Sequence, residues 1–327
     1  MKQTISKILI IVLVCAASTP AYASDRLIKR ASRYFEPLSA QMPGAERDTP
    51  AMVSLGEKLF KDPRLSINST QACSNCHRLD PGFAGVDNLP LSPGARGGLG
   101  NRNTPTVFNS GWQFKQFWDG RAADLVEQAK EPILNLVEMG MPDESAVEER
   151  LNSIPEYSAL FTEAFPDSKP ATSFQNVAEA IASFERTLTT PSRFDDYLNG
   201  DPEALTEHEK RGLKTFLRAN CQSCHDGALL GGGVLEPMGK ENPYENQDDQ
   251  GRFEHTGLEK DRMLFKVAPL RNVALTFPYF HDGRVATLPE AVRRMAYLQL
   301  NKELTEQQID DITAFLGSLT GRAFEDN

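Results

Sequence analysis

The sequence predicts a mainly α-helical protein built from two similar domains. A Cys-x-x-Cys-His pentapeptide occurs twice, at residues 73–77 and 221–225. Each copy follows a segment with hydrophobic residues at helical spacing and precedes, far downstream, another such segment. Strand signals are nearly absent. The repeated order of helix, pentapeptide and helix indicates a duplicated helical unit.

The pentapeptides predict two covalently attached c-type haems. In this motif the two thiols add to the haem vinyl groups as thioethers, and the adjacent imidazole becomes the proximal iron ligand. The residues concerned are Cys73, Cys76, His77, Cys221, Cys224 and His225. A zinc site would need a further Cys or His pair nearby, and a redox dithiol would need a βαβ context; the sequence has neither. We therefore expect two cytochrome c-like domains, each carrying one haem.

The first 23 residues predict a secretory signal peptide. Lys2 and Lys7 precede the apolar run Ile8–Val14, and a small-residue site ends at Ala23. We expect cleavage after Ala23 and a periplasmic mature protein. Cys15 would leave with this segment, so the four remaining cysteines all belong to the pentapeptides and none is left for a disulfide. No other apolar run is long enough for a membrane span.

Charge argues against nucleic acid as a partner. Removing Lys2 and Lys7 leaves 33 basic residues against 45 acidic ones, a net charge of −12 for the mature chain. Such a surface would steer a basic electron carrier, and it would equally keep an exported protein soluble. Both interpretations stay open at this point.

Four helices frame the pentapeptides. The first is predicted to begin at Thr49-Pro50, with threonine as cap and proline at the first helical position. The helix before the second pentapeptide begins after Thr206, with Glu209 completing a capping box. Closing helices are predicted over residues 177–188 and 309–319. The residues placed on their buried faces are Met52, Leu55, Leu59, Phe60, Leu213, Phe216, Leu217, Val177, Ile181, Phe184, Leu188, Ile309, Ile312, Leu316 and Leu319.

Two segments are predicted to be irregular. A polar connector with Pro and Gly runs over residues 190–202 and marks the domain boundary. The predicted domains are residues 24–190 and 191–327. Residues 226–262 are rich in Gly, Asn, Asp and Glu without periodicity, which predicts a long surface loop or a mobile interface segment.

A second repeat supports the duplication and narrows the search for iron ligands. Residues 117–121, Phe-Trp-Asp-Gly-Arg, align with 280–284, Phe-His-Asp-Gly-Arg, so Trp118 and His281 are equivalent. A haem that only transfers electrons has two protein ligands, whereas one that activates a small molecule keeps a position open. Candidate second ligands for the second haem are Met238, Met263 and Met295. We favour Met295, which lies on the helical run 288–300, although the same spacing fits a core methionine.

These motifs resemble those of the bacterial di-haem cytochrome c peroxidases over nearly all of the mature chain. The resemblance rests on the pentapeptides, on residues 117–121 and on residues 271–283. It implies that Trp118 lies between the haems, that Gln128 and Glu138 belong to the peroxide pocket, and that Met295 is an axial ligand. It also implies an inter-domain calcium ion, with Asn103, Thr276 and Pro278 around it.

One loop departs from the family pattern. In many of these peroxidases a histidine after the first pentapeptide caps the resting peroxidatic haem and leaves when the other haem is reduced. Here Ala95 occupies that place, and no His, Met, Cys or Lys lies between Leu91 and Arg102. We therefore expect the first haem to be open before any reduction.

The resemblance implies an exported peroxidase that reduces hydrogen peroxide to water with two electrons from a small cytochrome c or a cupredoxin. His77 would hold the peroxidatic iron, Glu138 would move a proton between the peroxide oxygens, and Gln128 would help to position it. His225 and Met295 would hold the electron-accepting iron. One alternative is a relative of the methylamine-utilisation di-haem oxidases, which act on a partner protein and carry a tyrosine ligand. The other is a di-haem electron-transfer cytochrome without turnover, and a homodimer is compatible with each.

Overall fold

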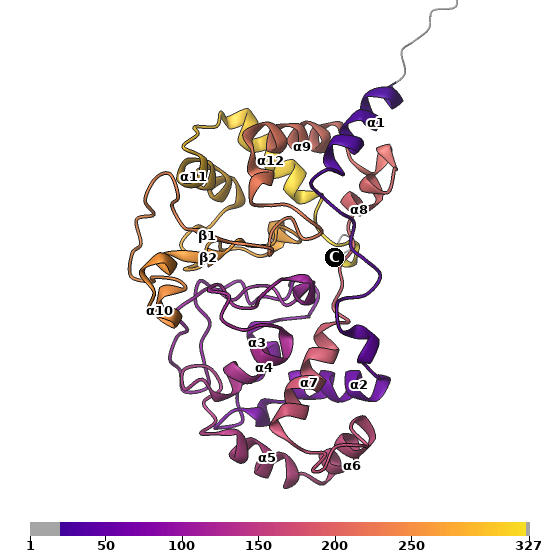
Figure 1. The fold of residues 1–327 in the computed structure, drawn as a ribbon, viewed down its shortest axis with the longest axis vertical. Helices are drawn as coiled ribbons and strands as arrows, with labels where there is room; N and C mark the ends of the chain where they lie inside the picture. The colour runs from indigo at the N-terminus through magenta and orange to yellow at the C-terminus, as the bar shows by residue number, and fades with distance from the viewer. Residues whose placement is uncertain (1–19, 325–327) are drawn as a thin grey trace, which may run out of the picture.

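The structure is a computed structural model that describes residues 20–324. These residues form two helical lobes stacked along the long axis (Figure 1). The lower lobe contains α2 (Pro50–Phe60), α3 (Cys73–Cys76), α4 (Leu125–Leu134), α5 (Glu144–Asn152), α6 (Pro155–Ala164) and α7 (Phe174–Glu185). The upper lobe contains α1 (Pro20–Ala31), α8 (Arg193–Leu198), α9 (Glu207–Ala219), α11 (Leu288–Leu300) and α12 (Glu306–Gly317). The prediction of a mainly helical protein is confirmed.

One small sheet and one short helix lie near the level where the lobes meet (Figure 1). β1 (Leu235–Pro237) pairs antiparallel with β2 (Leu264–Lys266), and α10 (Phe253–Thr256) lies between them in the sequence. Within residues 20–324 no helix is both long and apolar enough to cross a membrane.

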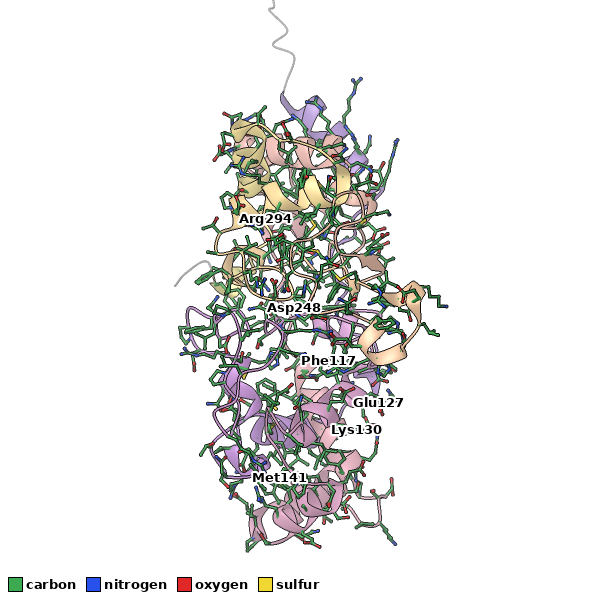
Figure 2. The ribbon with its side chains drawn as sticks, turned by 90° about the vertical axis from the view of Figure 1, so that its left-hand side faces the viewer. Phe117, Glu127, Lys130, Met141, Asp248 and Arg294 are labelled. Carbon is green, nitrogen blue, oxygen red and sulfur yellow. The ribbon has the colours of Figure 1, made fainter. Side chains whose placement is uncertain are left out.

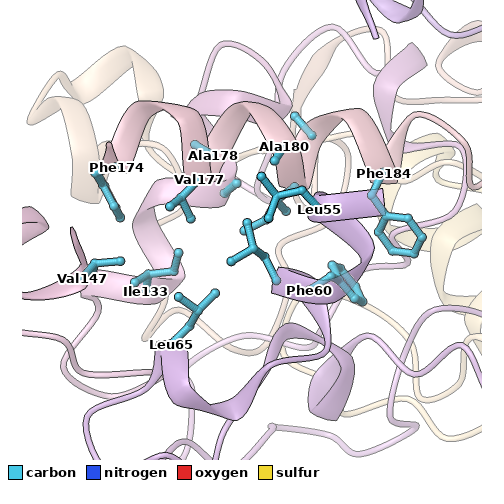
Figure 3. Packing of buried hydrophobic residues seen from close by; sticks show 14 of the residues in the cluster. Leu55, Phe60, Leu65, Ile133, Val147, Phe174, Val177, Ala178, Ala180 and Phe184 are labelled. Atoms are coloured by element: carbon cyan, nitrogen blue, oxygen red, sulfur yellow. The ribbon is translucent and has the colours of Figure 1, made fainter. Parts of the chain in front are cut away.

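The core of the lower lobe forms where α2 crosses α7. Thr49 caps α2 as predicted, its side chain accepting a hydrogen bond from the Met52 amide at 3.2 Å. A Cβ atom on Gly56 would lie 1.8 Å from the Ala180 carbonyl oxygen, so the two backbones approach more closely than any side chain would allow. Figure 3 shows Leu55 and Phe184 in the buried cluster at this crossing.

The upper lobe repeats this arrangement with α9 and α12. The predicted capping box is present: the Thr206 hydroxyl accepts from the Glu209 amide at 3.2 Å, and the Glu209 carboxylate accepts from the Thr206 amide at 2.7 Å. A Cβ on Gly212 would lie 1.9 Å from the Asp311 carbonyl oxygen. The duplicated units therefore share both their helix order and a glycine at the helix crossing.

The N-terminal helix packs on the upper lobe. Leu27, Ala31 and Phe35 belong to the buried cluster of that lobe, and Phe35 meets Phe194 edge-on at 5.6 Å between ring centroids. The sequence prediction had placed these residues in the first domain, within 24–190. The predicted run Ile8–Val14 lies outside the described residues, and the predicted cleavage point after Ala23 falls within α1.

The segment 190–202 is not the polar connector that its composition predicted. It contains α8, in which Phe194 and Tyr197 are fully buried. Arg271 donates two hydrogen bonds to the Asp195 carboxylate, at 2.7 and 2.8 Å, and is itself 1% exposed. This charged pair joins α8 to the lobe through a residue that lies far away in the sequence, which composition does not reveal.

The segment 226–262 is likewise more ordered than predicted. It contributes β1 and α10, and Tyr244 is buried with its hydroxyl donating to the Asp282 carboxylate. The backbone amides of Glu241 and Asn242 donate to the Leu298 carbonyl of α11 at 2.9 and 3.1 Å. Its order depends on partners in other elements rather than on a periodic pattern of its own.

Candidate haem sites and their junction

The first candidate site is a cavity in the lower lobe that contains the first pentapeptide. Cys73 and Cys76 stand at the two ends of α3, and His77 follows. The His77 Nδ1 lies 3.3 Å from the Gly85 carbonyl oxygen, which leaves Nε2 for a metal. Burial lowers the pKa of His77 and so favours the neutral imidazole that binds iron.

The second site repeats this geometry in the upper lobe. Cys221, Cys224 and His225 line one cavity, and His225 Nδ1 lies 3.1 Å from the Leu230 carbonyl oxygen. Gly231 has φ +133°, and a Cβ there would lie 2.3 Å from the Ala268 carbonyl oxygen and 3.3 Å from His225 Nδ1. A glycine is therefore required where the chain passes the imidazole.

These two residue sets fit covalently attached haems. All four pentapeptide cysteines are free rather than paired as disulfides. Each cavity combines two thiols with an imidazole that is oriented through Nδ1, which is the donor set that c-type attachment needs.

Methionine donors are present in the second cavity. Met295 on α11 and Met238 both line it, whereas Met263 does not and instead packs with Met238 in a small buried cluster. The structure thus brings the favoured candidate to the cavity, together with one of its two competitors.

The first cavity carries a polar wall built by α4 and the turn after it. Gln128, Pro132 and Glu138 line this wall, and Arg121, which precedes α4, lines the same cavity. The Asn135 side-chain amide donates to Glu138 Oε1 at 2.9 Å. Burial raises the pKa of the Glu138 carboxyl, and the Arg121 guanidinium opposes that shift. A carboxyl with a raised pKa in such a cavity is suited to take up and return a proton.

The loop that lacks the histidine packs directly on the Glu138 segment. The Ala95 amide donates to the Glu138 carbonyl oxygen at 2.7 Å, and the Asn68 side chain donates to the Ala95 carbonyl oxygen at 2.6 Å. A Cβ on Gly94 would lie 1.7 Å from the Val137 carbonyl oxygen. The residues of this loop that line the cavity are Ser92, Pro93, Gly94, Gly100 and Asn101, and none has a side chain suited to bind haem iron.

Trp118 lies at the junction of the two sites and lines both cavities. Its indole N–H donates to the Asn103 carbonyl oxygen at 2.8 Å, and its ring meets His281 edge-on at 6.4 Å. His281 in turn stacks on Phe265 at 4.1 Å. Figure 2 shows Phe117 at the level where the lobes meet.

An ion-pair network crosses the junction. Arg102 donates to the Asp119 carboxylate at 2.6 Å and to the two Asp249 carboxylate oxygens at 2.6 and 2.8 Å, and its side chain is 10% exposed. Asp249 comes from the segment predicted as a loop; its neighbour Asp248 is labelled in Figure 2. Sequence reasoning missed Asp249, because nothing in its local pattern shows a partner so far away in the chain.

The three residues predicted to surround a calcium ion line the same cavity. Asn103, Thr276 and Pro278 all line the second cavity, and the Asn103 side-chain amide donates to the Leu89 carbonyl oxygen at 2.9 Å. A separate group, His208, Asp310 and Asp311, brings its potential ligand atoms within 4.8 Å of one another on α9 and α12. Sequence reasoning did not single out this second group.

Two further buried groups were also missed. Glu185 on α7 lines the first cavity, and burial raises its pKa to about 8; its Oε2 has no hydrogen-bond partner among residues 20–324. Its position one helical turn after Ile181 was a signal that it lies on the buried face. Lys266, the last residue of β2, lines both cavities, and strand periodicity over three residues is too short to indicate that.

Two cavities, each with the attachment set for one c-type haem and joined through a shared tryptophan, define a di-haem oxidoreductase. The family profile described as di-haem cytochrome c peroxidase matches residues 50–203. The cytochrome c551 peroxidase of Pseudomonas aeruginosa is 44% identical over 321 residues, covering 95% of this chain and 91% of that protein. The chain belongs to the di-haem cytochrome c peroxidase family, which also confirms the predicted enzyme class of haem peroxidase.

The family includes proteins of a second type. The methylamine utilization protein MauG of Methylophilus methylotrophus is 33% identical, covering 90% of this chain and 89% of that protein. The crystal structure of a MauG-like protein associated with microbial copper homeostasis superposes with a TM-score of 0.76 at 29% identity, covering 88% of this chain and 94% of that one. The fold is therefore that of the di-haem peroxidases.

Proposed function

We propose that this chain is an exported di-haem peroxidase that reduces hydrogen peroxide to water with electrons from a small cytochrome c or a cupredoxin. One observation carries the proposal: the buried Glu138 carboxyl shares a cavity with Cys73, Cys76 and His77. The overall reaction consumes two electrons and two protons for each peroxide and releases two water molecules. The haems, when bound, supply the redox chemistry.

The side chains of the first cavity handle the protons. In its carboxylate form Glu138 would accept a proton from one peroxide oxygen and return it to the other, which would leave as water. The Asn135 amide holds the Glu138 carboxyl at 2.9 Å, and Gln128 on the same wall orients the substrate. The second proton of the reaction comes from solvent.

The second cavity receives the electrons. Met295 and His225 would hold the second iron, and methionine ligation would raise the potential of that haem. Trp118 lies on the path because it lines both cavities. Each haem belongs to one cytochrome c-like domain, residues 24–190 or 191–327, although Leu27, Ala31 and Phe35 at the start of the first range pack on the second lobe. Calcium binds near Asn103 between the domains.

The first site operates without a capping loop ligand. The loop around Ala95 is tied to the Glu138 backbone and presents no suitable ligand to the cavity. This supports a first haem that is open in the resting enzyme. The signal peptide of residues 1–23 directs the protein to the periplasm.

The relation to MauG favours one further candidate, a di-haem oxidase that acts on a partner protein. Met295 in the second cavity argues against it, because the resemblance assigns those oxidases a tyrosine ligand. Tyr279 also lines that cavity, but its hydroxyl donates to the Val273 carbonyl oxygen at 3.1 Å.

A steady-state assay tests the proposal. Purified holoprotein is mixed with hydrogen peroxide and either a reduced small cytochrome c or a reduced cupredoxin, and two oxidised donors are expected for each peroxide consumed. Absence of peroxide-dependent donor oxidation, together with two low-spin, six-coordinate haems in every redox state, would instead identify an electron-transfer cytochrome.

A further inference from the structure

Lys266 is a buried lysine at the boundary of the two haem cavities. The residue is 6% exposed, and its ammonium donates hydrogen bonds to the Gln113 side-chain oxygen and, at 3.1 Å, to the Lys115 carbonyl oxygen. The backbone amide of Lys266 donates to the Trp118 carbonyl oxygen at 2.6 Å, so the strand holds this lysine against the tryptophan segment.

Lys266 differs in its chemistry from the other described residues that line both cavities. Of the residues in 20–324 that line both cavities, Lys266 has the one ionisable side chain. The other residues that line both are Asn103, Thr104, Pro105, Thr106, Gln113, Phe117 and Trp118.

Residues 20–324 supply no free counter-charge for this ammonium. Both of its hydrogen-bond acceptors are neutral oxygens, and no carboxylate within residues 20–324 forms an ion pair with it. Asp119, the acid that acts on it electrostatically, is already bound by Arg102 at 2.6 Å and Arg121 at 2.9 Å. Burial lowers the pKa of Lys266 to about 7. A buried ammonium without a partner is costly, so the site calls for an anion.

We propose that the Lys266 ammonium binds a haem propionate at the junction of the two cavities and thereby positions that haem and raises its potential. Each c-type haem is tethered through its vinyl groups, which leaves its two propionate carboxylates as the anions that enter these cavities. A propionate carboxylate of either haem supplies the counter-charge that the Lys266 ammonium lacks. Because Lys266 lines both cavities, that propionate can belong to the first or the second haem. The inference requires bound haem but not peroxide turnover.

The test measures haem potentials in the intact di-haem protein. Lys266→Met keeps most of the length of the side chain and removes its charge, whereas Lys266→Arg keeps the charge. Lys240→Met is the matched control, because it removes the same charge from a side chain that is 48% exposed and pairs with Glu236. Spectroelectrochemical titration gives the midpoint potential of each haem separately.

A nearby cation disfavours the ferric haem, so its removal lowers the potential. In Lys266→Met we expect about a tenfold rise in the ferric-to-ferrous ratio of one haem at a fixed applied potential, about 59 mV for a one-electron couple. Lys266→Arg should restore most of the potential, and Lys240→Met should change it little because water screens that charge. A shift in the first haem, the second haem or both identifies the propionate source.

Unchanged potentials in a fully haem-loaded Lys266→Met variant would overturn the proposal, as would equal shifts in the Met and Arg variants. If Lys266→Met does not fold, the wild-type protein still decides the matter through its redox infrared difference spectrum with propionate-labelled haem. A propionate that pairs with an ammonium gives carboxylate bands in both redox states. Labelled bands of protonated carboxylic acids alone would refute the pairing.

Discussion

Glu138 owes its proposed role to its surroundings rather than to its position in a motif. Because burial raises its pKa, the carboxylate that accepts a proton is lost at higher pH than for an exposed glutamate, whose ordinary value is 4.5. We expect the acid limb of kcat/KM to lie above pH 4.5. Glu138→Gln should keep both haems and lose turnover by about 10²–10⁴-fold, since the amide cannot take the proton.

Glu127→Gln is the matched control for this prediction. Glu127 lies on α4 with its side chain 51% exposed and pairs with Lys130 at 2.7 Å; Figure 2 labels both residues. It should turn over at the wild-type rate with the same pH profile. Near-normal turnover in Glu138→Gln would remove Glu138 from the mechanism.

Met295 and Met238 line the same cavity, and a ligand substitution shows which of the two binds the second haem iron. Met295→His should lower the potential of the second haem and slow the acceptance of electrons without emptying either haem site, because imidazole does not stabilise the ferrous state as thioether sulfur does. Potentiometry and the near-infrared charge-transfer band of methionine ligation provide the measurement. Met238→Leu should change neither, and the opposite pattern would assign the ligand to Met238.

Side chains with fixed local spacing were predictable, and those defined by distant partners were not. The pentapeptides place two thiols and an imidazole within five residues, so the sequence alone identifies them. Lys266 and Asp249 acquire their environments from Gln113 and Arg102, on segments far away in the chain. Charge and composition place such residues on the surface, although the fold buries Lys266.

The crossing of α9 and α12 sets a steric limit within the upper lobe. A methyl group on Gly212 would meet the Asp311 backbone, which cannot move without moving the helix. We expect Gly212→Ala to destabilise the protein by about 1–3 kcal/mol, as overpacked cores do. Gly317→Ala in α12 is the control, since no atom lies within 4 Å of the added Cβ. Denaturant unfolding of both holoproteins measures the difference, and equal stability would contradict the steric argument.

Elements with local caps were predicted well, and elements that depend on tertiary contacts were not. Thr49 and the Thr206–Glu209 pair mark their helices because the cap and its partner are three residues apart. α8 also has a local cap, in which the Ser192 amide donates to the Asp195 carboxylate at 2.7 Å, but Arg271, far away in the sequence, holds the same carboxylate. The polar composition of residues 190–202 and 226–262 therefore indicated loops. The structure has α8 in the first segment, and the short β1 and α10 within a second segment that is otherwise irregular.

On the scale of the molecule, the internal repeat predicted two units but not their contact. α1 packs on the upper lobe before the chain enters the lower one (Figure 1), so the two lobes do not follow the order of the sequence. The Arg102–Asp249 pair and Trp118 then join the lobes at the junction. Such contacts connect the two haem sites through folded structure rather than through a linker.

Because the two haem sites are connected in this way, the coordination of the first haem in the resting enzyme can depend on the redox state of the second. In relatives with a loop histidine, reduction of one haem shifts a loop at the other, a population switch between two arrangements. Here the loop of residues 92–101 has no such ligand and is tied to Glu138 through Ala95. We therefore expect the fully oxidised protein to show a high-spin ferric signal by electron paramagnetic resonance, and rapid mixing with peroxide to consume it without reductant.

Two low-spin haems that react only after one-electron reduction would contradict this expectation. The ligand would then have to come from another wall of the first cavity, where Met139 has a sulfur and Lys266 an amine. Met139→Leu and Lys266→Leu would show which one is responsible, because loss of the true ligand would restore the high-spin signal. If the wild type is already high-spin, neither variant should change it, because the absence of a loop ligand removes the coupling between reduction of the second haem and opening of the first.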